Sequence, residues 1–284
     1  AATPICVSLQ RVLVYDSMSN RSQGQLKMDN HQPDYMQLAT MVFDLLDRAS
    51  TSSTYEYAVL MGLIDCCQSE VDENGHAPSI INTRNLARKV LDIYWAQARP
   101  YQLTGSILRQ NSSGQTKILN HIQAFRERFP RRTSTFSAEQ TNRVAFTKLL
   151  NDVEWSLIEM PLPRLQCLGA LDHNFLYNIS WTRGVKKGSD GVSSYLQNFI
   201  IEYPKHTDFD AQIRLQPGVG EFLLRMGPLL RPLIQREWSK TVAGFNKLPS
   251  KALEDFLFAP ERQALTKLVE PLSDVQEGKC FYCH

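Results

Sequence analysis

The chain has 284 residues, of which 43% are hydrophobic and 21% are charged, and its formal net charge is +2. A chain of this length and composition buries a sizeable core and forms one large or two moderate globular domains. No stretch approaches the ~18 apolar residues of a membrane-spanning helix, and no secretory signal peptide is visible. We therefore expect no membrane partner.

The first half of the chain carries apolar side chains at helical spacing. Four helices are expected, over residues 34–48, 54–68, 83–95 and 113–129. Thr54 and Thr83 are the expected N-caps of the second and the third helix. A longer helix is expected over residues 137–159, and Pro161 and Pro163 are expected to stop it.

The pattern changes after these two prolines. Residues 175–181 mostly alternate as a β-strand does, and residues 212–215 predict a second short strand. A long apolar helix is expected over residues 218–245, in which Pro228 and Pro232 should start or kink parts of the helix. Two shorter helices are expected over residues 250–258 and 261–275.

Together these elements predict a mainly α fold with a small β element, of the α+β class. The change from helical to alternating periodicity places a domain boundary near the proline pair. The predicted regions are a helical, basic region, an α+β region and a short metal-binding element, over residues 1–165, 166–279 and 280–284.

Cysteine usage indicates a reducing compartment, and we therefore expect a cytoplasmic protein. The adjacent Cys66 and Cys67 lie inside an apolar, helix-like stretch, which suits buried free thiols better than a disulfide framework. The complete set of cysteines is at positions 6, 66, 67, 167, 280 and 283.

The charge is unevenly distributed although the net charge is small. The segment from Asp29 to Glu73 holds nine acidic residues and one basic residue, whereas the segment from Arg84 to Lys148 holds twelve basic and three acidic residues. Such a basic segment favours a polyanionic partner such as DNA. The alternative is that the two segments pack together and neutralise each other, as in a scaffold for protein interactions.

Basic and amide side chains cluster near the start of the helix expected at residue 83. Arg84, Asn85, Arg88 and Lys89 lie within its first two turns. Arg and Asn can pair with guanine and adenine edges, and a helix fits the major groove, so this segment resembles part of a helix-turn-helix motif. Base reading, phosphate contact and a solvated basic face over a helical core are the three interpretations.

Two further groups of residues are candidates for DNA contact. Arg109, Gln110 and Lys117 lie in and after a loop that leads into a helix N-terminus, where backbone amides and side-chain donors can converge on phosphate. An ordinary capped loop is the alternative. A basic cluster follows, for which we expect electrostatic rather than specific contacts: Arg126, Arg128, Arg131 and Arg132.

The last five residues, Cys280-Phe281-Tyr282-Cys283-His284, have the spacing of a zinc knuckle. Two cysteines separated by two residues let both thiolates reach one tetrahedral zinc ion, which takes four ligands. His284 is a nearby candidate for a third ligand. We expect Cys280 and Cys283 to hold a structural zinc ion together with ligands from a longer protein, of which this chain is the front portion.

The segment from Gly278 to Cys283 resembles the entry to the HNH nuclease domain of bacterial HNH endonuclease family proteins. The resemblance covers roughly residues 213–283, and upstream it rests on residues 83–95 and 107–129. It implies that the cysteine pair joins a later pair around zinc, with the catalytic histidine between the pairs in a ββα-metal fold. No His-centred motif follows Cys283 in this chain, so we expect no catalytic residue in it and no DNA cleavage by it alone.

The resemblance implies that the chain is the DNA-recognising portion of an HNH-type, metal-dependent DNA endonuclease, with restriction or phage defence as its context. In the HNH mechanism a histidine activates water, while one divalent ion, usually magnesium, stabilises the scissile phosphate. The expected partner is DNA, and an oligomer is compatible with the sequence. The alternative function is a non-catalytic DNA-binding regulator with a structural zinc knuckle.

Overall fold

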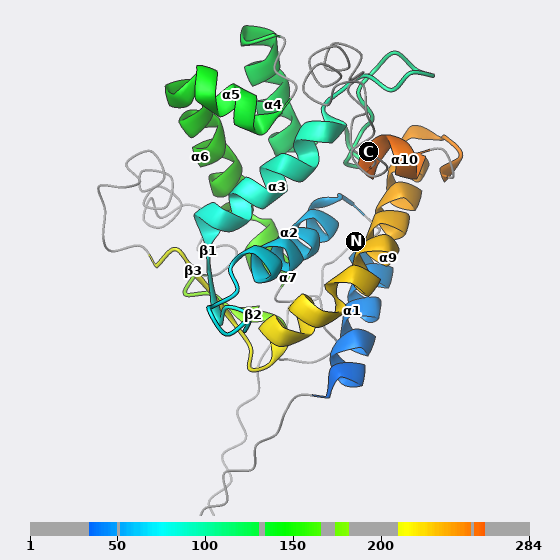
Figure 1. The fold of residues 1–284 in the computed structure, drawn as a ribbon. Coiled ribbons are helices and arrows are strands. Elements are labelled where there is room, and N and C mark those ends of the chain that lie inside the picture. Colours follow the sequence, from blue (N-terminus) through cyan, green and yellow to red (C-terminus); the bar gives the residue numbers. More distant parts are fainter. Residues whose placement is uncertain are drawn as a thin grey trace, which may run out of the picture. The chain divides into compact units, whose positions relative to one another are not determined.

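The helix at the centre of the fold is largely apolar, and its two charged residues, Glu56 and Asp65, pair with Arg164 and Arg231. The structure is a computed structural model that describes residues 34–49, 52–130, 134–165, 174–181, 210–250 and 253–258. Its central helix, α2 (Tyr55–Ser69), is buried along most of its length. It lies between α3 (Thr83–Gln97) and α9 (Val219–Asn246), as Figure 1 shows.

Two glycines allow α2 to approach its neighbours closely. A Cβ atom at Gly62 of α2 would lie 2.7 Å from Cδ1 of Leu86 on α3. A Cβ atom at Gly227 of α9 would lie 2.7 Å from Cγ2 of Ile64 on α2. A larger residue at either crossing would therefore displace the facing side chain or move the helices apart, because protein interiors are close-packed.

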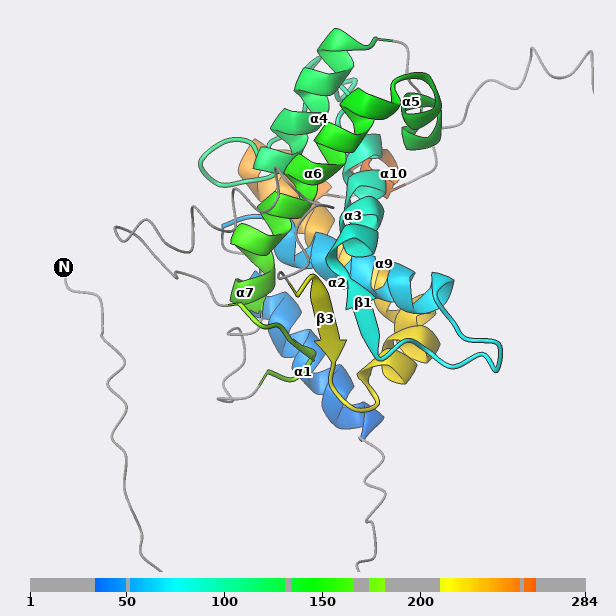
Figure 2. The same ribbon diagram turned by 90° about the vertical axis from the view of Figure 1, so that its left-hand side faces the viewer.

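The other helices of the described residues surround this centre: α1 (Tyr35–Ala49), α4 (Lys117–Arg128), α5 (Thr135–Thr141), α6 (Arg143–Glu159), α7 (Pro161–Leu165) and α10 (Leu253–Phe258). α6 packs along α3 and α4, with α5 before it in the chain and α7 after it (Figure 2). α1 lies against α9 and α2, whereas α10 packs against α9 and α3. None of the helices in the described ranges is long and apolar enough to cross a membrane.

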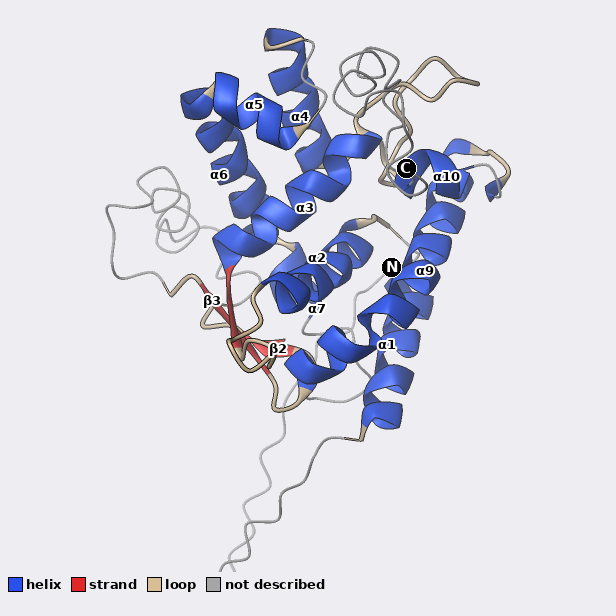
Figure 3. Cartoon of the chain, in the orientation of Figure 1, coloured by secondary structure: helices blue, strands red, loops and turns tan. Residues whose placement is uncertain are grey.

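A small antiparallel sheet lies at one end of these helices (Figure 3). Its strands are β1 (Ile80–Asn82), β2 (Tyr177–Asn178) and β3 (Gln212–Leu215), in the order β1-β3-β2. Ile81 pairs with Ile213, and both side chains are fully buried. The sheet thus closes the core with its apolar side chains.

The predicted fold class is confirmed. Helices make up 66% of the interpretable residues, and the three-stranded sheet is the small β element. β1 comes from the region before the boundary predicted at residue 165, whereas β2 and β3 come from the region after it. The described residues on both sides of that boundary therefore share one core.

The helix expected over residues 137–159 is two helices. Asn142 is the C-cap of α5 and stands at the N-cap position of α6. Pro161 does not stop helical structure but begins α7, because proline at the first helical position loses no helical hydrogen bond. The strand predicted over residues 212–215 is confirmed, and the helix predicted over residues 261–275 lies outside the described residues.

Trp238 of α9 is the largest fully buried side chain, and aromatic rings surround it. Its ring centroid lies 6.1 Å from that of Tyr57 on α2, 5.4 Å from that of Tyr94 on α3 and 5.3 Å from that of Phe258 on α10. One indole therefore contacts rings from three other helices. Aromatic packing of this kind supplies both buried area and specific geometry.

Gln110 provides the polar complement of this aromatic cluster and is itself fully buried. Its Oε1 accepts a hydrogen bond from Trp238 Nε1 at 2.8 Å, and its Nε2 donates to Gln97 Oε1 at 2.7 Å. Its backbone carbonyl accepts from Thr54 N at 3.1 Å. The prediction that Gln110 contacts DNA is therefore wrong, because its amide lies in the core and is already hydrogen-bonded.

We expect Gln110→Ala to lower the free energy of unfolding by about 2–4 kcal/mol, because it leaves buried donors and acceptors of Trp238 and Gln97 without partners. Gln102→Ala, at an exposed position of a nearby loop, is the matched control and should change it by less than about 0.5 kcal/mol. Urea unfolding followed by tryptophan fluorescence measures both. Equal effects of the two substitutions would contradict the structural role of Gln110.

Candidate nucleic-acid interface

Two side chains position the first turn of α3. Asn82 is the N-cap, and its Oδ1 accepts a hydrogen bond from Arg84 N at 2.8 Å. The N-cap predicted at Thr83 is wrong, because the Thr83 hydroxyl donates to Glu154 Oε1 at 2.7 Å in the core. The less buried side of the first two turns of α3 then holds Arg84, Asn85, Arg88 and Lys89.

A cavity of about 450 Å³ lies beside these turns, among α3, α5 and α6, and we call it the α3–α6 cavity. All four residues predicted on α3 line it. The residues that complete its lining are Ser69, Glu70, Glu139, Arg143, Phe146, Thr147 and Leu150. The structure thus adds Arg143 of α6 to the predicted group, although the sequence shows Arg143 only as one member of a long basic segment.

Arg84 is held by a carboxylate inside the core. Its Nη1 lies 3.0 Å from Oε2 of Glu154, whose side chain is 1% exposed. Burial raises the pKa of Glu154, and this outweighs the hydrogen bond from Thr83 and the charge of Arg84, which both lower it. Arg84 therefore compensates a buried charge, and its removal would leave that charge without its cation.

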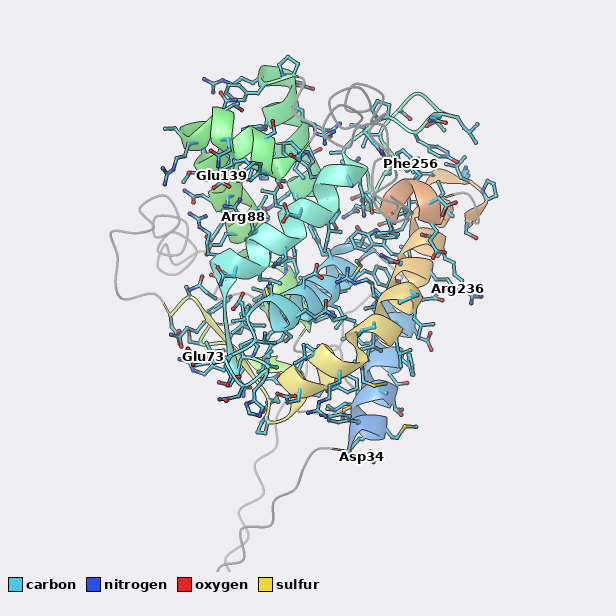
Figure 4. The ribbon with its side chains drawn as sticks, viewed as in Figure 1. Asp34, Glu73, Arg88, Glu139, Arg236 and Phe256 are labelled. Carbon is cyan, nitrogen blue, oxygen red and sulfur yellow. The ribbon has the colours of Figure 1, made fainter. Side chains whose placement is uncertain are left out.

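Arg88 forms a two-pronged contact with Glu139 at the edge of the cavity. Its Nη1 and Nη2 donate to the two carboxylate oxygens of Glu139 at 2.7 and 2.8 Å. The guanidinium carbon also lies 5.2 Å from the ring centroid of Phe146. The hydrogen bonds from Arg88 hold the pKa of Glu139 below its usual value. Figure 4 shows this pair, with Arg88 on α3 and Glu139 on α5.

Asn85, Lys89 and Arg143 form fewer hydrogen bonds and ion pairs than Arg84 and Arg88 do. Asn85 Nδ2 donates to Glu70 Oε1 at 3.1 Å. The side chains of Lys89 and Arg143 form no hydrogen bond or ion pair with another described residue. These two cations can therefore meet an anionic ligand without first breaking a contact within the described part of the chain.

α3 does not present a whole face to solvent. It packs against α2 and α6, and also contacts α4, α5 and α10. Asn85 and Asp92 are its only exposed residues. A helix that reads bases inserts one side into the major groove, so this placement favours phosphate contact over base reading by α3.

Three other predicted DNA contacts lie elsewhere and have partners within the protein. Arg126 donates to the carbonyl oxygens of Trp95 and Ala98, both at 2.7 Å, and so caps the end of α3. The Arg109 guanidinium donates to the Phe245 carbonyl at the end of α9. Lys117 Nζ lies 2.6 Å from Oε2 of Glu159. None of these three residues lines the α3–α6 cavity.

The loop predicted to grip phosphate is an ordinary connection into α4. Thr116 caps that helix, and its hydroxyl accepts from Leu119 N at 3.4 Å. The amide of Lys117 donates to Tyr55 Oη at 2.8 Å. Protein groups therefore already occupy these two amides at the start of α4, where an anion would otherwise bind.

Arg128 lines a second, smaller cavity of about 200 Å³ between α4 and α6. His121, Lys148 and Asp152 also line it, and the sequence patterns did not single out these three. Burial raises the pKa of Asp152, while the nearby charges of His121 and Lys148 act in the opposite direction. Sequence spacing does not bring these residues together, because they come from two helices that meet only in the folded chain.

The predicted zinc ligands Cys280 and Cys283 lie outside the described residues, as do Arg131 and Arg132. Within the described ranges, no group of three or more His, Cys, Asp or Glu side chains could hold a metal ion. The prediction of buried free thiols at Cys66 and Cys67 is confirmed. Burial raises the pKa of the Cys67 thiol to about 12, so it remains protonated.

No protein-family model, curated protein or solved structure matches this chain. The α3–α6 cavity is therefore the feature from which a function can be inferred. It gathers four cations, the amide of Asn85 and two carboxylates at one concave site, and the excess of cations suits an anionic ligand.

We expect Glu154→Gln to change how stability depends on pH. Because the pKa of Glu154 is raised, the folded protein holds its proton more tightly than the unfolded chain does. This carboxyl therefore lowers the free energy of unfolding progressively as the pH rises above 4.5, the ordinary pKa of a glutamate side chain. Gln does not titrate and has no such effect. The free energy of unfolding of Glu154→Gln, relative to the unsubstituted protein, should rise between about pH 4 and pH 7.

Urea titrations at several pH values measure this difference. The charge of Arg84 opposes this increase, but the net effect of the surroundings still raises the pKa of Glu154. Glu127→Gln, at an exposed position on α4, is the control and should show a nearly constant difference. A constant difference for Glu154→Gln as well would contradict the burial of its carboxyl.

Proposed function

We propose that this chain binds DNA through phosphate contacts in the α3–α6 cavity and is the DNA-recognising portion of an HNH-type, metal-dependent endonuclease. The observation that carries the binding proposal is the convergence of Arg88, Lys89 and Arg143 on one cavity, beside Arg84, which compensates Glu154. The nuclease context rests on the resemblance of residues 213–283 to HNH endonuclease family proteins. Restriction or phage defence is the context that this resemblance implies.

The distribution of charge in the cavity supports a phosphate ligand. Lys89 and Arg143 offer cations without a hydrogen-bonded partner among the described residues. The hydroxyls of Ser69 and Thr147 already donate to the backbone carbonyls of Asp65 and Arg143. Most protein–DNA hydrogen bonds go to phosphate and sugar, and such contacts carry no base information directly. We therefore expect binding to depend strongly on salt and only weakly on DNA sequence.

The acidic and basic segments pack together through α2 and α3, but the ion pairs argue against the mutual neutralisation that the scaffold alternative requires. Glu56 and Asp65 of the acidic segment pair with Arg164 and Arg231, which lie outside the basic segment. None of the ion pairs between described residues joins the acidic segment to the basic one. The basic segment therefore keeps cations at its surface.

A non-catalytic DNA-binding regulator is the second candidate, because it would use the same cavity. The two candidates differ only in whether the protein cuts DNA. We place either function in the cytoplasm, since the buried free thiols of Cys66 and Cys67 suit a reducing compartment.

The proposed zinc site uses Cys280 and Cys283, whose thiolates supply two of the four ligands that structural zinc takes. This donor chemistry fits zinc, and the remaining ligands would come from residues outside the described ranges. When bound, zinc would order the knuckle, whereas magnesium or another divalent ion would serve hydrolysis at the HNH motif. The residues of the α3–α6 cavity would hold the DNA in place.

We expect the double substitution Lys89→Ala, Arg143→Ala to weaken DNA binding and to flatten its salt dependence. Removing one phosphate-binding cation should lower the slope of log K against log salt by about 0.9, so the double variant should have a slope smaller by about 1.8. Fluorescence anisotropy with a labelled duplex of mixed sequence, at several salt concentrations, measures the slope.

The matched control is Arg225→Ala, Arg236→Ala, which removes the same charge from α9. Figure 4 shows Arg236 on α9, away from the labelled pair of Arg88 and Glu139. This control should leave the slope nearly unchanged. An equal decrease in both double variants would contradict the cavity as the binding site. Affinity that does not respond to salt would contradict phosphate binding altogether.

The nuclease proposal predicts separable roles for the knuckle and the cavity. In a longer protein in which an HNH motif follows Cys283, Cys280→Ser should release zinc and abolish DNA cleavage but leave DNA binding intact. Zinc stoichiometry, plasmid nicking and anisotropy measure the three properties. Zinc retained by the Cys280→Ser, Cys283→Ser double variant would contradict the ligand assignment. DNA binding without cleavage by the unsubstituted longer protein would favour the regulator.

A further inference from the structure

Arg88 lines the cavity, but its guanidinium is already bound to a carboxylate, that of Glu139. Both terminal nitrogens of its guanidinium donate to Glu139, at 2.7 and 2.8 Å. The side chains of Arg88 and Glu139 are 35% and 31% exposed, so solvent reaches the pair at the cavity edge. A ligand that enters the cavity from solvent can therefore reach this contact.

The two oxygens of Glu139 resemble the two non-bridging oxygens of a phosphodiester. Arginine presents parallel N–H groups in a rigid fork, which binds carboxylate and phosphate with the same two-pronged geometry. The Arg88 guanidinium also lies over the ring of Phe146, with its central carbon 5.2 Å from the ring centroid. Arg88 is thus already oriented for an oxyanion, and Glu139 stands where that oxyanion would bind.

Glu139 can leave this position without unfolding its helix. α5 is held independently by the buried Ala138 and by a hydrogen bond from the Thr135 hydroxyl to Asp92. Arg143 lies close enough to lower the pKa of Glu139 by its charge, so a displaced carboxylate would still have a cation nearby. A rotation of the Glu139 side chain would therefore expose the Arg88 fork while α5 stays in place.

We propose that Arg88 is the anchor for one phosphodiester group and that Glu139 is an internal competitor, which fills the phosphate position until DNA displaces it. This inference rests on the proposed function, since it names the subsite and the ligand group of the same cavity. Non-specific anions that offer a single oxygen would gain little against the two-pronged contact, whereas a DNA strand that also engages Lys89 and Arg143 would displace Glu139.

The Glu139→Gln variant tests this inference against a purely structural ion pair. If Glu139 competes with phosphate, the neutral amide should release Arg88 and tighten binding of a labelled DNA duplex by roughly tenfold at low salt. If the pair only holds α5 on α3, the substitution should weaken DNA binding or leave it unchanged. Anisotropy at constant salt measures the affinity, and circular dichroism confirms that the variant is folded.

Glu70→Gln is the matched control, because it removes the same charge from the same cavity. Glu70 accepts from the neutral amide of Asn85 and not from a cation, so we expect a gain of less than about threefold. In an Arg88→Ala background, Glu139→Gln should give no further gain beyond that of Glu70→Gln. Equal gains from Glu139→Gln and Glu70→Gln in the presence of Arg88 would overturn the inference, while DNA binding would stand.

Glu139→Asp provides a second test should the Gln variant fail to fold. It keeps the charge but withdraws the carboxylate by one methylene, which breaks the two-pronged geometry. We expect it to tighten DNA binding by a smaller factor than Glu139→Gln. A folded Glu139→Asp that binds no more tightly than the unsubstituted protein would overturn the inference. Absence of DNA binding by every form, including the unsubstituted protein, would instead overturn the proposed function.

Discussion

One buried residue, Gln110, ties together the three helices α2, α3 and α9. Its side chain accepts from Trp238 on α9 and donates to Gln97 on α3, while its carbonyl accepts from Thr54 at the start of α2. An unpaired buried donor or acceptor costs about 1–3 kcal/mol, so none of the three helices can slide without breaking this network. The aromatic rings around Trp238 then pack against helices whose positions are already set.

The α3–α6 cavity depends on this arrangement, because α3 takes part in the Gln110 network and also lines the cavity. Gly62 lets α3 approach α2, which buries its apolar side and leaves its basic side toward α5 and α6. A second buried contact, from Thr83 and Arg84 to Glu154, holds α6 beside α3. The cations of the cavity therefore stand on a rigid core rather than on loops, and such support keeps binding groups in position.

The structure also shows why a count of basic residues overestimates the cations that a ligand can reach. Arg126 and Arg109 bind backbone carbonyls at helix ends, where a planar guanidinium with several donors fits well. Arg84 compensates a buried carboxylate. The sequence could identify the basic turns of α3 as a candidate site, but it could not show that Arg143 joins them or that Glu139 occupies Arg88. Those facts depend on contacts between α3, α5 and α6.

The sequence by itself determined the fold class, most helices and the strand β3, because hydrophobic periodicity depends on neighbouring residues. It did not reveal β1, which needs β3, more than a hundred residues away, to complete its hydrogen bonds. The burial of Gln110 and the pairing of Arg88 were likewise decided by the tertiary structure. Gln110 meets Trp238 across 128 positions, and Arg88 meets Glu139 across 51. Local spacing cannot encode such partners, because helix packing alone brings them together.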